Sequence, residues 1–230
     1  MKIVILAGGK GTRLSEYTKI IPKPMVQIGS KPILEHIIDY YSKFGFKEFI
    51  IASGYKHSII KNYFKKKKSV KIDVINTGIE TLTGSRLKKL KNELKHTFML
   101  TYGDGLSNIN LKKLLEFHKK SKKKITLTAV HPPARFGELT IVKNTVSKFK
   151  EKPQLQKGWI NGGFFVVEPE FLEFIGNKNV MLERFPLIKA VKTKNLAAYK
   201  HTGFWFCMDT LRDKKVLESL IKNKKLPWLK

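Results

Sequence analysis

Segments of strand character alternate with segments of helical character over the first 130 residues of this chain. The strand-like segments cover residues 2–7, 48–52, 70–75, 97–101 and 125–130. Between them, apolar residues recur at helical spacing over residues 32–44, 57–64, 85–94 and 110–120. Parallel strands must be joined by a crossover, which is usually a helix. This order therefore predicts an α/β fold with a doubly wound, mostly parallel sheet that binds ligands outside the carboxyl ends of its strands.

The pattern changes after Pro132 and Pro133. Two short apolar runs that flank residues 143–145 predict a β-hairpin over 139–142 and 146–149. The remaining predicted elements are strands at 163–167 and 196–201 and helices at 169–174, 181–192 and 210–223. We expect one unit, residues 1–230, with two lobes: residues 1–131 around the parallel sheet and residues 132–230 with the hairpin and the C-terminal helix.

A glycine-rich turn follows the first predicted strand, in the order Gly8, Gly9, Lys10, Gly11, Thr12, Arg13. Glycines let backbone N–H groups approach phosphate oxygens, and the two cations would neutralise them. The turn matches neither the P-loop nor the dinucleotide fingerprint, since Thr-Arg follows Gly11 and Leu14 stands where a small residue is needed. A plain strand-to-helix turn is the alternative, but three glycines there cost chain entropy and add no core.

Three charged residues have a setting suited to phosphate chemistry. Lys23 stands between two prolines that stiffen the backbone, and a rigidly held ammonium suits a phosphoryl group; an ordinary loop lysine is the alternative that the tetrapeptide alone leaves open. Asp104 follows a predicted strand and lies between two glycines, where it could hold Mg²⁺. Asp209 could supply a second carboxylate, or it could cap the helix that follows; taken alone, the sequence favours the cap.

Composition excludes several classes of protein. The formal net charge is +28, but only five of the 46 basic residues are arginine, which favours a lysine-rich solvated surface over nucleic-acid binding. The apolar runs are far shorter than the roughly 20 residues of a membrane helix. One cysteine gives neither an internal disulfide nor a cysteine-only zinc site. We expect a soluble, cytoplasmic protein with no nucleic-acid and no membrane partner.

Ten segments in order resemble the sugar nucleotidyltransferases, and most closely their glucose-1-phosphate cytidylyltransferase branch. The strings Trp159-Ile-Asn-Gly-Gly-Phe-Phe165 and Met208-Asp-Thr-Leu-Arg-Asp-Lys214 are typical of that branch. The other segments cover residues 6–14, 22–25, 29–33, 83–86, 101–105, 135–137, 151–153 and 203–205. This sequence differs from the family at two places: at residues 62–74, where the family has a longer connection, and at Ser85, where glycine is usual.

The resemblance implies a Rossmann-like nucleotide-binding lobe, an appended sugar-binding lobe and a role for each matching residue. Lys23, Arg13 and Asp104 would be catalytic, and Mg²⁺ would be held by Asp104 and Asp209. The implied nucleotide-binding residues are Leu6, Ala7, Gly8, Gly9, Gly11, Thr12, Arg13, Lys23, Thr83, Gly84, Arg86, Gly103 and Asp104. The implied substrate-binding residues are Glu151, Lys152, Asn161, Gly162 and Trp205, of which Trp205 could instead be core packing.

The implied reaction joins CTP to a sugar 1-phosphate, giving a CDP-sugar and pyrophosphate for nucleotide-sugar biosynthesis, in an enzyme expected to be a homo-oligomer. The acceptor phosphate would attack the α-phosphorus in line, with catalysis from positioning and electrostatics. Two alternatives remain from the sequence. The shortened segment at residues 62–74 could go with another nucleotide or another phosphorylated acceptor. The second alternative is a catalytically silent relative that binds nucleotides or nucleic acid. Loss of motif residues would favour it, but Lys23, Asp104, Lys152 and Asp209 are all present.

Overall fold

A computed structural model describes residues 1–67, 69–132, 138–150 and 158–229 of the chain. Its strands are β1 (Lys2–Ala7), β2 (Gln27–Ile28), β3 (Lys31–Pro32), β4 (Glu48–Ser53), β5 (Lys71–Asn76), β6 (Phe98–Tyr102), β7 (Gly105–Ser107), β8 (Ile125–Val130), β9 (Glu138–Val142), β10 (Thr145–Lys150), β11 (Ile160–Asn161), β12 (Phe165–Val167), β13 (Leu196–His201) and β14 (Trp205–Cys207). Its α-helices are α1 (Ser15–Thr18), α2 (Ile33–Lys43), α3 (His57–Phe64), α4 (Thr83–Lys88), α5 (Leu111–Ser121), α6 (Phe185–Lys192) and α7 (Leu211–Lys222). Short 3₁₀ turns cover Thr12–Leu14, Lys23–Met25, Lys91–Glu93, Pro169–Phe174 and Pro227–Leu229.

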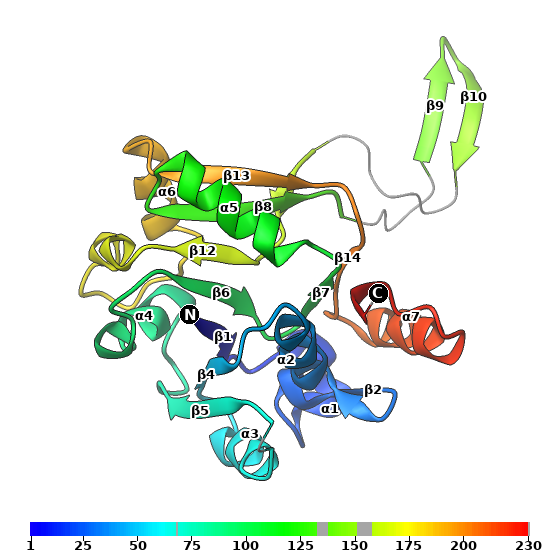
Figure 1. Cartoon of the computed structure of the whole chain (residues 1–230). Coiled ribbons are helices and arrows are strands. Elements are labelled where there is room, and N and C mark those ends of the chain that lie inside the picture. The colour runs from blue at the N-terminus through cyan, green and yellow to red at the C-terminus, as the bar shows by residue number, and fades with distance from the viewer. Residues whose placement is uncertain (68, 133–137, 151–157, 230) are drawn as a thin grey trace.

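The central sheet of the described residues has the strand order β11-β8-β12-β6-β1-β4-β5, and β13 pairs with β8 (Figure 1). Strand β1 lies between β4 and β6 and is parallel to both. Strand β12 runs antiparallel to its neighbours β6 and β8. The fold is therefore α/β with a mixed, mostly parallel sheet, as the alternation of segments predicted.

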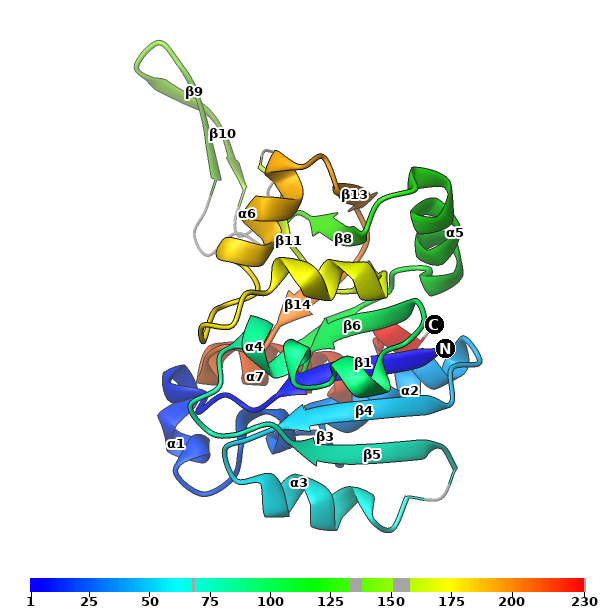
Figure 2. The ribbon, with the colours of Figure 1, turned by 90° about the vertical axis from the view of Figure 1, so that its left-hand side faces the viewer.

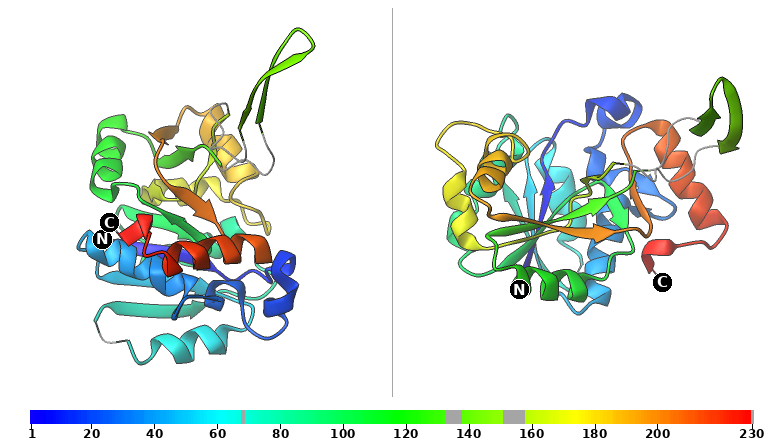
Figure 3. Two further views of the ribbon diagram at one scale, coloured as in Figure 1. Left: turned by 90° about the vertical axis from the view of Figure 1, so that its right-hand side faces the viewer. Right: turned by 90° about the horizontal axis from the view of Figure 1, so that it is seen from above.

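Helices cover both faces of the sheet, and the strand sequences are apolar on both sides for that reason (Figure 2, Figure 3). In β1, Ile3 and Ile5 belong to one buried cluster, together with side chains of α2, α5 and α7. Val4 and Leu6 belong to a second cluster, with side chains of α4 and α6. Because successive side chains of a strand point to opposite faces, one continuous apolar run supplies both cores.

Three predicted helices differ most from the structure. The helix predicted at 85–94 is the six-residue α4, Thr83–Lys88, followed by a 3₁₀ turn at Lys91–Glu93. The helix predicted at 181–192 begins at Phe185, after Arg184 with non-helical backbone angles. The segment at 169–174 is 3₁₀ rather than α-helical, beginning with Pro169. In each case the apolar side chains pack as expected, but the backbone is tighter or shorter than the periodicity indicates.

The predicted hairpin forms as β9 and β10, which extend away from the sheet (Figure 1). A second pairing matters more for the site. Strand β14 pairs antiparallel with β7, with Cys207 opposite Gly105. Met208 N–H also donates to the carbonyl of Asp104 at 2.9 Å. This ladder brings residues that are about a hundred positions apart in sequence to one point at the carboxyl end of β6.

Among the described residues, the helices are too short or too polar to cross a membrane.

Candidate active site

The glycine turn after β1 is shaped by close neighbours. Gly11 has a φ of 64°, in the left-handed region that glycine adopts without strain. A Cβ at Gly11 would lie 2.7 Å from Lys23 Cβ, and a Cβ at Gly8 would lie 2.0 Å from the Arg86 guanidinium. Gly8 and Gly11 are therefore needed so that the turn can pack against these two cations.

Lys23 lies at the centre of an ion-pair cluster. Pro22 has extended backbone, and Lys23, Pro24 and Met25 form one 3₁₀ turn in which all three residues are buried. The Lys23 side chain is only 11% exposed, and its Nζ donates to Asp104 Oδ2 at 2.6 Å and to Asp209 Oδ1 at 2.5 Å. Burial lowers the pKa of Lys23, but the attraction of Asp104 and the hydrogen bonds to both carboxylates outweigh burial, so the pKa is raised. Lys23 is a fixed cation.

The two aspartates come from distant parts of the chain. Asp104 follows β6, and Asp209 follows β14, where the β7–β14 ladder holds it. Asp209 Oδ2 also accepts from Arg13 Nη1 at 2.7 Å. Ligand atoms of Asp104, Cys207 and Asp209 all lie within 4.8 Å of one another. Carboxylate oxygens are the ligands that Mg²⁺ prefers, with substrate phosphates completing the shell, so the two aspartates fit this ion.

The structure excludes the helix cap as the role of the Asp209 side chain. Thr210 is the N-cap of α7: its hydroxyl accepts from Asp213 N–H, and the Asp213 carboxylate accepts from Thr210 N–H at 2.8 Å. This capping box satisfies the start of the helix. The Asp209 carboxylate is left to bind Lys23 and Arg13.

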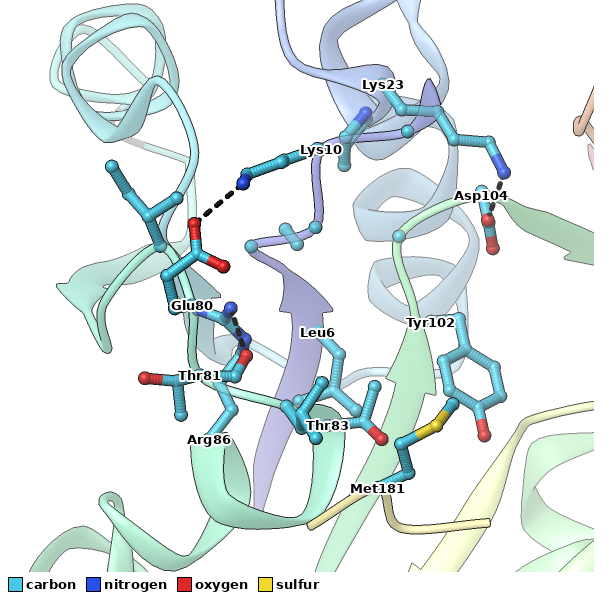
Figure 4. Close-up of a pocket in the computed structure, with 18 of the residues that line it drawn as sticks. Leu6, Lys10, Lys23, Glu80, Thr81, Thr83, Arg86, Tyr102, Asp104 and Met181 are labelled. Atoms are coloured by element: carbon cyan, nitrogen blue, oxygen red, sulfur yellow. Dashed lines mark hydrogen bonds and ion pairs between the residues drawn. The ribbon is translucent and has the colours of Figure 1, made fainter. Parts of the chain in front are cut away.

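A cavity of about 450 Å³ lies beside this cluster (Figure 4). It is bounded by the glycine turn, the loop before α4 and the carboxyl end of β6. Eleven of the predicted residues line it: Leu6, Ala7, Gly8, Gly9, Gly11, Arg13, Lys23, Thr83, Arg86, Gly103 and Asp104. Lys10, from the turn, forms an ion pair of 2.6 Å with Glu80, from the opposite wall (Figure 4). The predicted nucleotide-binding segments therefore meet around one space.

Arg86 lies in the wall of this cavity, but its guanidinium is bound to the protein. It is 2% exposed, and it donates to Ser53 O at 2.7 Å, to Thr81 O at 2.6 Å and to Thr77 Oγ1. Burial lowers its pKa. Arg86 therefore joins the end of β4 to the loop before α4 and fixes the shape of the cavity wall.

Thr12 and Gly84 are close to the cavity without lining it. Thr12 begins the 3₁₀ turn after the glycine turn. Gly84 packs against the backbone of residues 180–182, and its N–H donates to Val180 O at 3.1 Å.

The predicted acceptor residues are only partly within the described residues. Glu151 and Lys152 lie outside them. Asn161 ends β11, and in the turn that follows, with Gly162 and Gly163, Asn161 Oδ1 accepts from Gly163 N–H at 3.0 Å. Trp205 Nε1 donates to Gly162 O at 2.7 Å, so this indole supports the turn as well as packing against the core. Three of the five predicted residues are thus brought together.

Two residues of this region had no role assigned from the sequence. Tyr102 lines the cavity, and Glu183 binds both Tyr102 and Thr83 through hydrogen bonds. Tyr102 lies in the segment 101–105 that carries the resemblance, but Glu183 lies in no motif. Only its three-dimensional position reveals it.

The glycine turn, the fixed lysine and the pair of aspartates at the carboxyl ends of a mostly parallel sheet define a phosphate-handling site of the nucleotidyltransferase class. The nucleotidyl transferase family model matches residues 2–210, and the chain belongs to this family.

More particularly, the chain is 44% identical over 253 aligned positions to the glucose-1-phosphate cytidylyltransferase of Salmonella typhi, covering 99% of this chain and 98% of that protein. It is 40% identical to the probable glucose-1-phosphate cytidylyltransferase of Bacillus subtilis, covering 93% of each. The solved structure of HddC from Yersinia pseudotuberculosis, complexed with GMP-PN, matches with a TM-score of 0.76 at 25% identity, covering 96% of this chain and 99% of HddC. The 253 aligned positions exceed the 230 residues of this chain, so the Salmonella relative has segments that this chain lacks.

Proposed function

We propose that this chain is a glucose-1-phosphate cytidylyltransferase, which converts CTP and glucose 1-phosphate to CDP-glucose and pyrophosphate. The observation that carries the proposal is the contact of Lys23 with both Asp104 and Asp209 at the edge of the glycine-lined cavity. The 44% identity to a cytidylyltransferase over nearly the whole chain supports the choice of nucleotide and acceptor.

The reaction would need no nucleophile from the protein, because the acceptor phosphate is already an anion. An oxygen of glucose 1-phosphate forms a bond to the α-phosphorus of CTP, and the bond from that phosphorus to the bridging oxygen of pyrophosphate breaks. Backbone N–H groups of the glycine turn would bind the triphosphate, while Lys23 and Arg13 would neutralise charge that grows on the α-phosphate. Mg²⁺, bound by Asp104 and Asp209 with the phosphates, would supply further positive charge and help pyrophosphate leave.

In this proposal, Thr83, Gly84 and Arg86 form the base side of the site. Asn161, Gly162, Glu151 and Lys152 form the acceptor side, with Lys152 on the sugar phosphate. Residues 1–131 would be the nucleotide lobe and residues 132–230 the sugar-phosphate lobe. We further propose that the protein assembles as a homo-oligomer and that it works in the cytoplasm, where CTP is available.

A pyrophosphate-release assay with each of the four nucleoside triphosphates and a set of sugar 1-phosphates tests it. We expect turnover with CTP and glucose 1-phosphate to exceed that of every other pair. Turnover with a different pair only would show that the assigned substrates are wrong. Salt-dependent binding of duplex DNA without any turnover would show that the chain is a catalytically silent relative.

A guanine nucleotide is the second candidate for the base. It is supported by the resemblance to HddC, whose structure holds GMP-PN, and by the segments that the Salmonella relative has and this chain lacks. The same assay separates the two, because it compares GTP with CTP directly.

A further inference from the structure

One carboxylate links the two sides of the proposed site. Glu183 lies just before α6 and is half-buried. Its Oε2 accepts from Thr83 Oγ1 at 2.8 Å, and its Oε1 accepts from Tyr102 Oη at 2.5 Å. Thr83 begins α4 on the base side, and Thr83, Tyr102 and the neighbouring Met181 all line the cavity (Figure 4).

The chain of hydrogen bonds continues to the acceptor side. Tyr102 Oη accepts from Asn161 Nδ2 at 3.4 Å. The other end of the same amide, Asn161 Oδ1, accepts from Gly163 N–H at 3.0 Å. One connected series therefore runs from Thr83 through Glu183 and Tyr102 to the turn at Asn161.

The chemistry of a carboxylate sets the direction of this series. An ionised carboxylate only accepts, so both hydroxyls must donate to Glu183. The oxygen of Tyr102 is then left to accept from Asn161, and this fixes which end of the Asn161 amide faces Gly163. A change at Thr83 that moves Glu183 would thus be felt at Asn161, although the two residues do not touch.

The segment that carries Glu183 is itself held against the base side. Asn179 Oδ1 accepts from Leu82 N–H at 2.9 Å, and Val180 O accepts from the N–H groups of Gly84 and Ser85. Ser85 Oγ accepts from Val180 N–H at 2.8 Å. Glu183 therefore moves with the start of α4 rather than independently of it.

We propose that Glu183 is a positioning residue that couples occupancy of the base side, at Thr83, to the conformation of the acceptor turn, at Asn161, through the hydroxyl of Tyr102. The proposal deepens the function given above and rests on it for the assignment of the two sides. Coupling of this kind is measured as the factor by which one ligand changes the response to the other.

Glu183→Gln is the direct test, with Glu168→Gln as its matched control. Glutamine replaces one of the two accepting oxygens by an NH₂ group, which donates, so one of the two hydroxyls loses its acceptor in the present geometry. Glu168 also accepts from a threonine, Thr97, at 2.7 Å, and binds His118 at 2.9 Å, but it contacts no residue of the proposed site through these bonds. The two variants make the same chemical change in two similar networks.

Hydrogen exchange of the amides at Gly162 and Gly163 reports the coupling without turnover. Both amides donate within the protein, to Thr128 O and to Asn161 Oδ1. CTP should slow their exchange about fivefold or more in the unaltered chain and in Glu168→Gln, and this slowing should be lost in Glu183→Gln. Tyr102→Phe should also lose the slowing of exchange by CTP. The variant with both Glu183→Gln and Tyr102→Phe should show the same loss as each single variant, since both act on one series of hydrogen bonds.

Steady-state kinetics give the second readout. The KM for glucose 1-phosphate should rise about fivefold or more in Glu183→Gln and stay unchanged in Glu168→Gln. The proposal is overturned if Glu183→Gln changes only the melting temperature, or if the unaltered chain shows no slowing of exchange with a nucleotide. Absence of pyrophosphate release would instead overturn the proposed function, and exchange would then be measured with whichever nucleotide raises the melting temperature most.

Discussion

The cluster around Lys23 and the cluster around Lys67 are built from the same kinds of groups. In the second, Lys67 Nζ lies 3.0 Å from Glu35 Oε1 and 2.8 Å from Asp39 Oδ1, and Lys31 Nζ lies 2.7 Å from Asp39 Oδ2. Each cluster thus pairs two carboxylates with two cations. They differ in where the groups come from and in what lies beside them.

The partners in the Lys67 cluster are 4 to 32 positions apart in sequence, whereas Lys23 and its aspartates are 81 and 186 positions apart. The Lys67 cluster joins α2 to the chain just after α3. The Lys23 cluster lies at the carboxyl end of β6, beside the cavity and the glycine turn. Composition of an ion-pair cluster therefore does not identify a site; its place in the sheet topology does.

Lys23→Met should produce the largest difference between the clusters. We expect kcat to fall about 100-fold or more, since one preorganised charge at the α-phosphate is lost. Lys67→Met makes the same change in the other cluster and should leave kcat near its normal value. Steady-state rates of pyrophosphate release measure both, and near-normal turnover of Lys23→Met would remove Lys23 from the mechanism.

Asp209→Asn should have the next largest effect. Loss of one carboxylate should lower kcat about tenfold or more and raise the Mg²⁺ concentration needed for half-maximal rate. Mn²⁺ binding followed by electron paramagnetic resonance gives a readout independent of turnover. Asp39→Asn is the control from the second cluster, and equal metal binding by Asp209→Asn and the unaltered chain would contradict the proposed metal site.

The Lys67 cluster should reveal itself in stability rather than in rate. Burial raises the pKa of Glu35 and Asp39, but hydrogen bonds from Tyr63, Lys31 and Lys67 outweigh burial, so both pKa values are lowered. Because the folded-state pKa values are lowered, this contribution to stability is present above the ordinary carboxyl pKa of about 4 and is lost as the pH falls through the folded-state values.

Lys67→Met should therefore lower the free energy of unfolding by about 1–2 kcal/mol at pH 7, between the values typical of exposed and buried pairs. Its difference from the unaltered chain should shrink below about pH 4. Urea unfolding at pH 7 and pH 3 measures this, and a difference that stayed constant with pH would show that the ion pairs are not its cause.

Thr210→Ala should have the smallest effect. Thr210 caps α7 and its neighbour Asp209 belongs to the Lys23 cluster, so variants at the two positions distinguish helix capping from the site. Loss of the capping hydroxyl should lower the free energy of unfolding by about 1 kcal/mol. Turnover should remain near normal, because Thr210 binds Asp213 and not the Lys23 cluster. Denaturant unfolding and kcat are measured for both Thr210→Ala and Asp209→Asn. The first variant should lose stability and keep its turnover, whereas the second should lose turnover.

Much of the fold could be predicted from the sequence because its signals are local. The apolar run at residues 2–7, the glycine turn and the helical spacing of α2 each depend on neighbouring residues. The bounds of α4 and α6 could not be predicted, because the start of α4 and the segment before α6 are joined by long-range backbone hydrogen bonds, such as that from Gly84 N–H to Val180 O.

The sequence by itself determined the alternation of strands and helices, the glycine-rich turn and the family of this protein, since these depend on residue order and motif. Only the tertiary structure showed that Thr210 rather than Asp209 caps α7 and that Asp209 contacts Lys23, because that contact spans 186 positions of the sequence. It also revealed Glu183, which lies in no motif and acquires its partners from α4 and β6 only when the chain folds. Long-range hydrogen bonds and ion pairs leave no periodic trace in a sequence, and for that physical reason they appear only in the folded molecule.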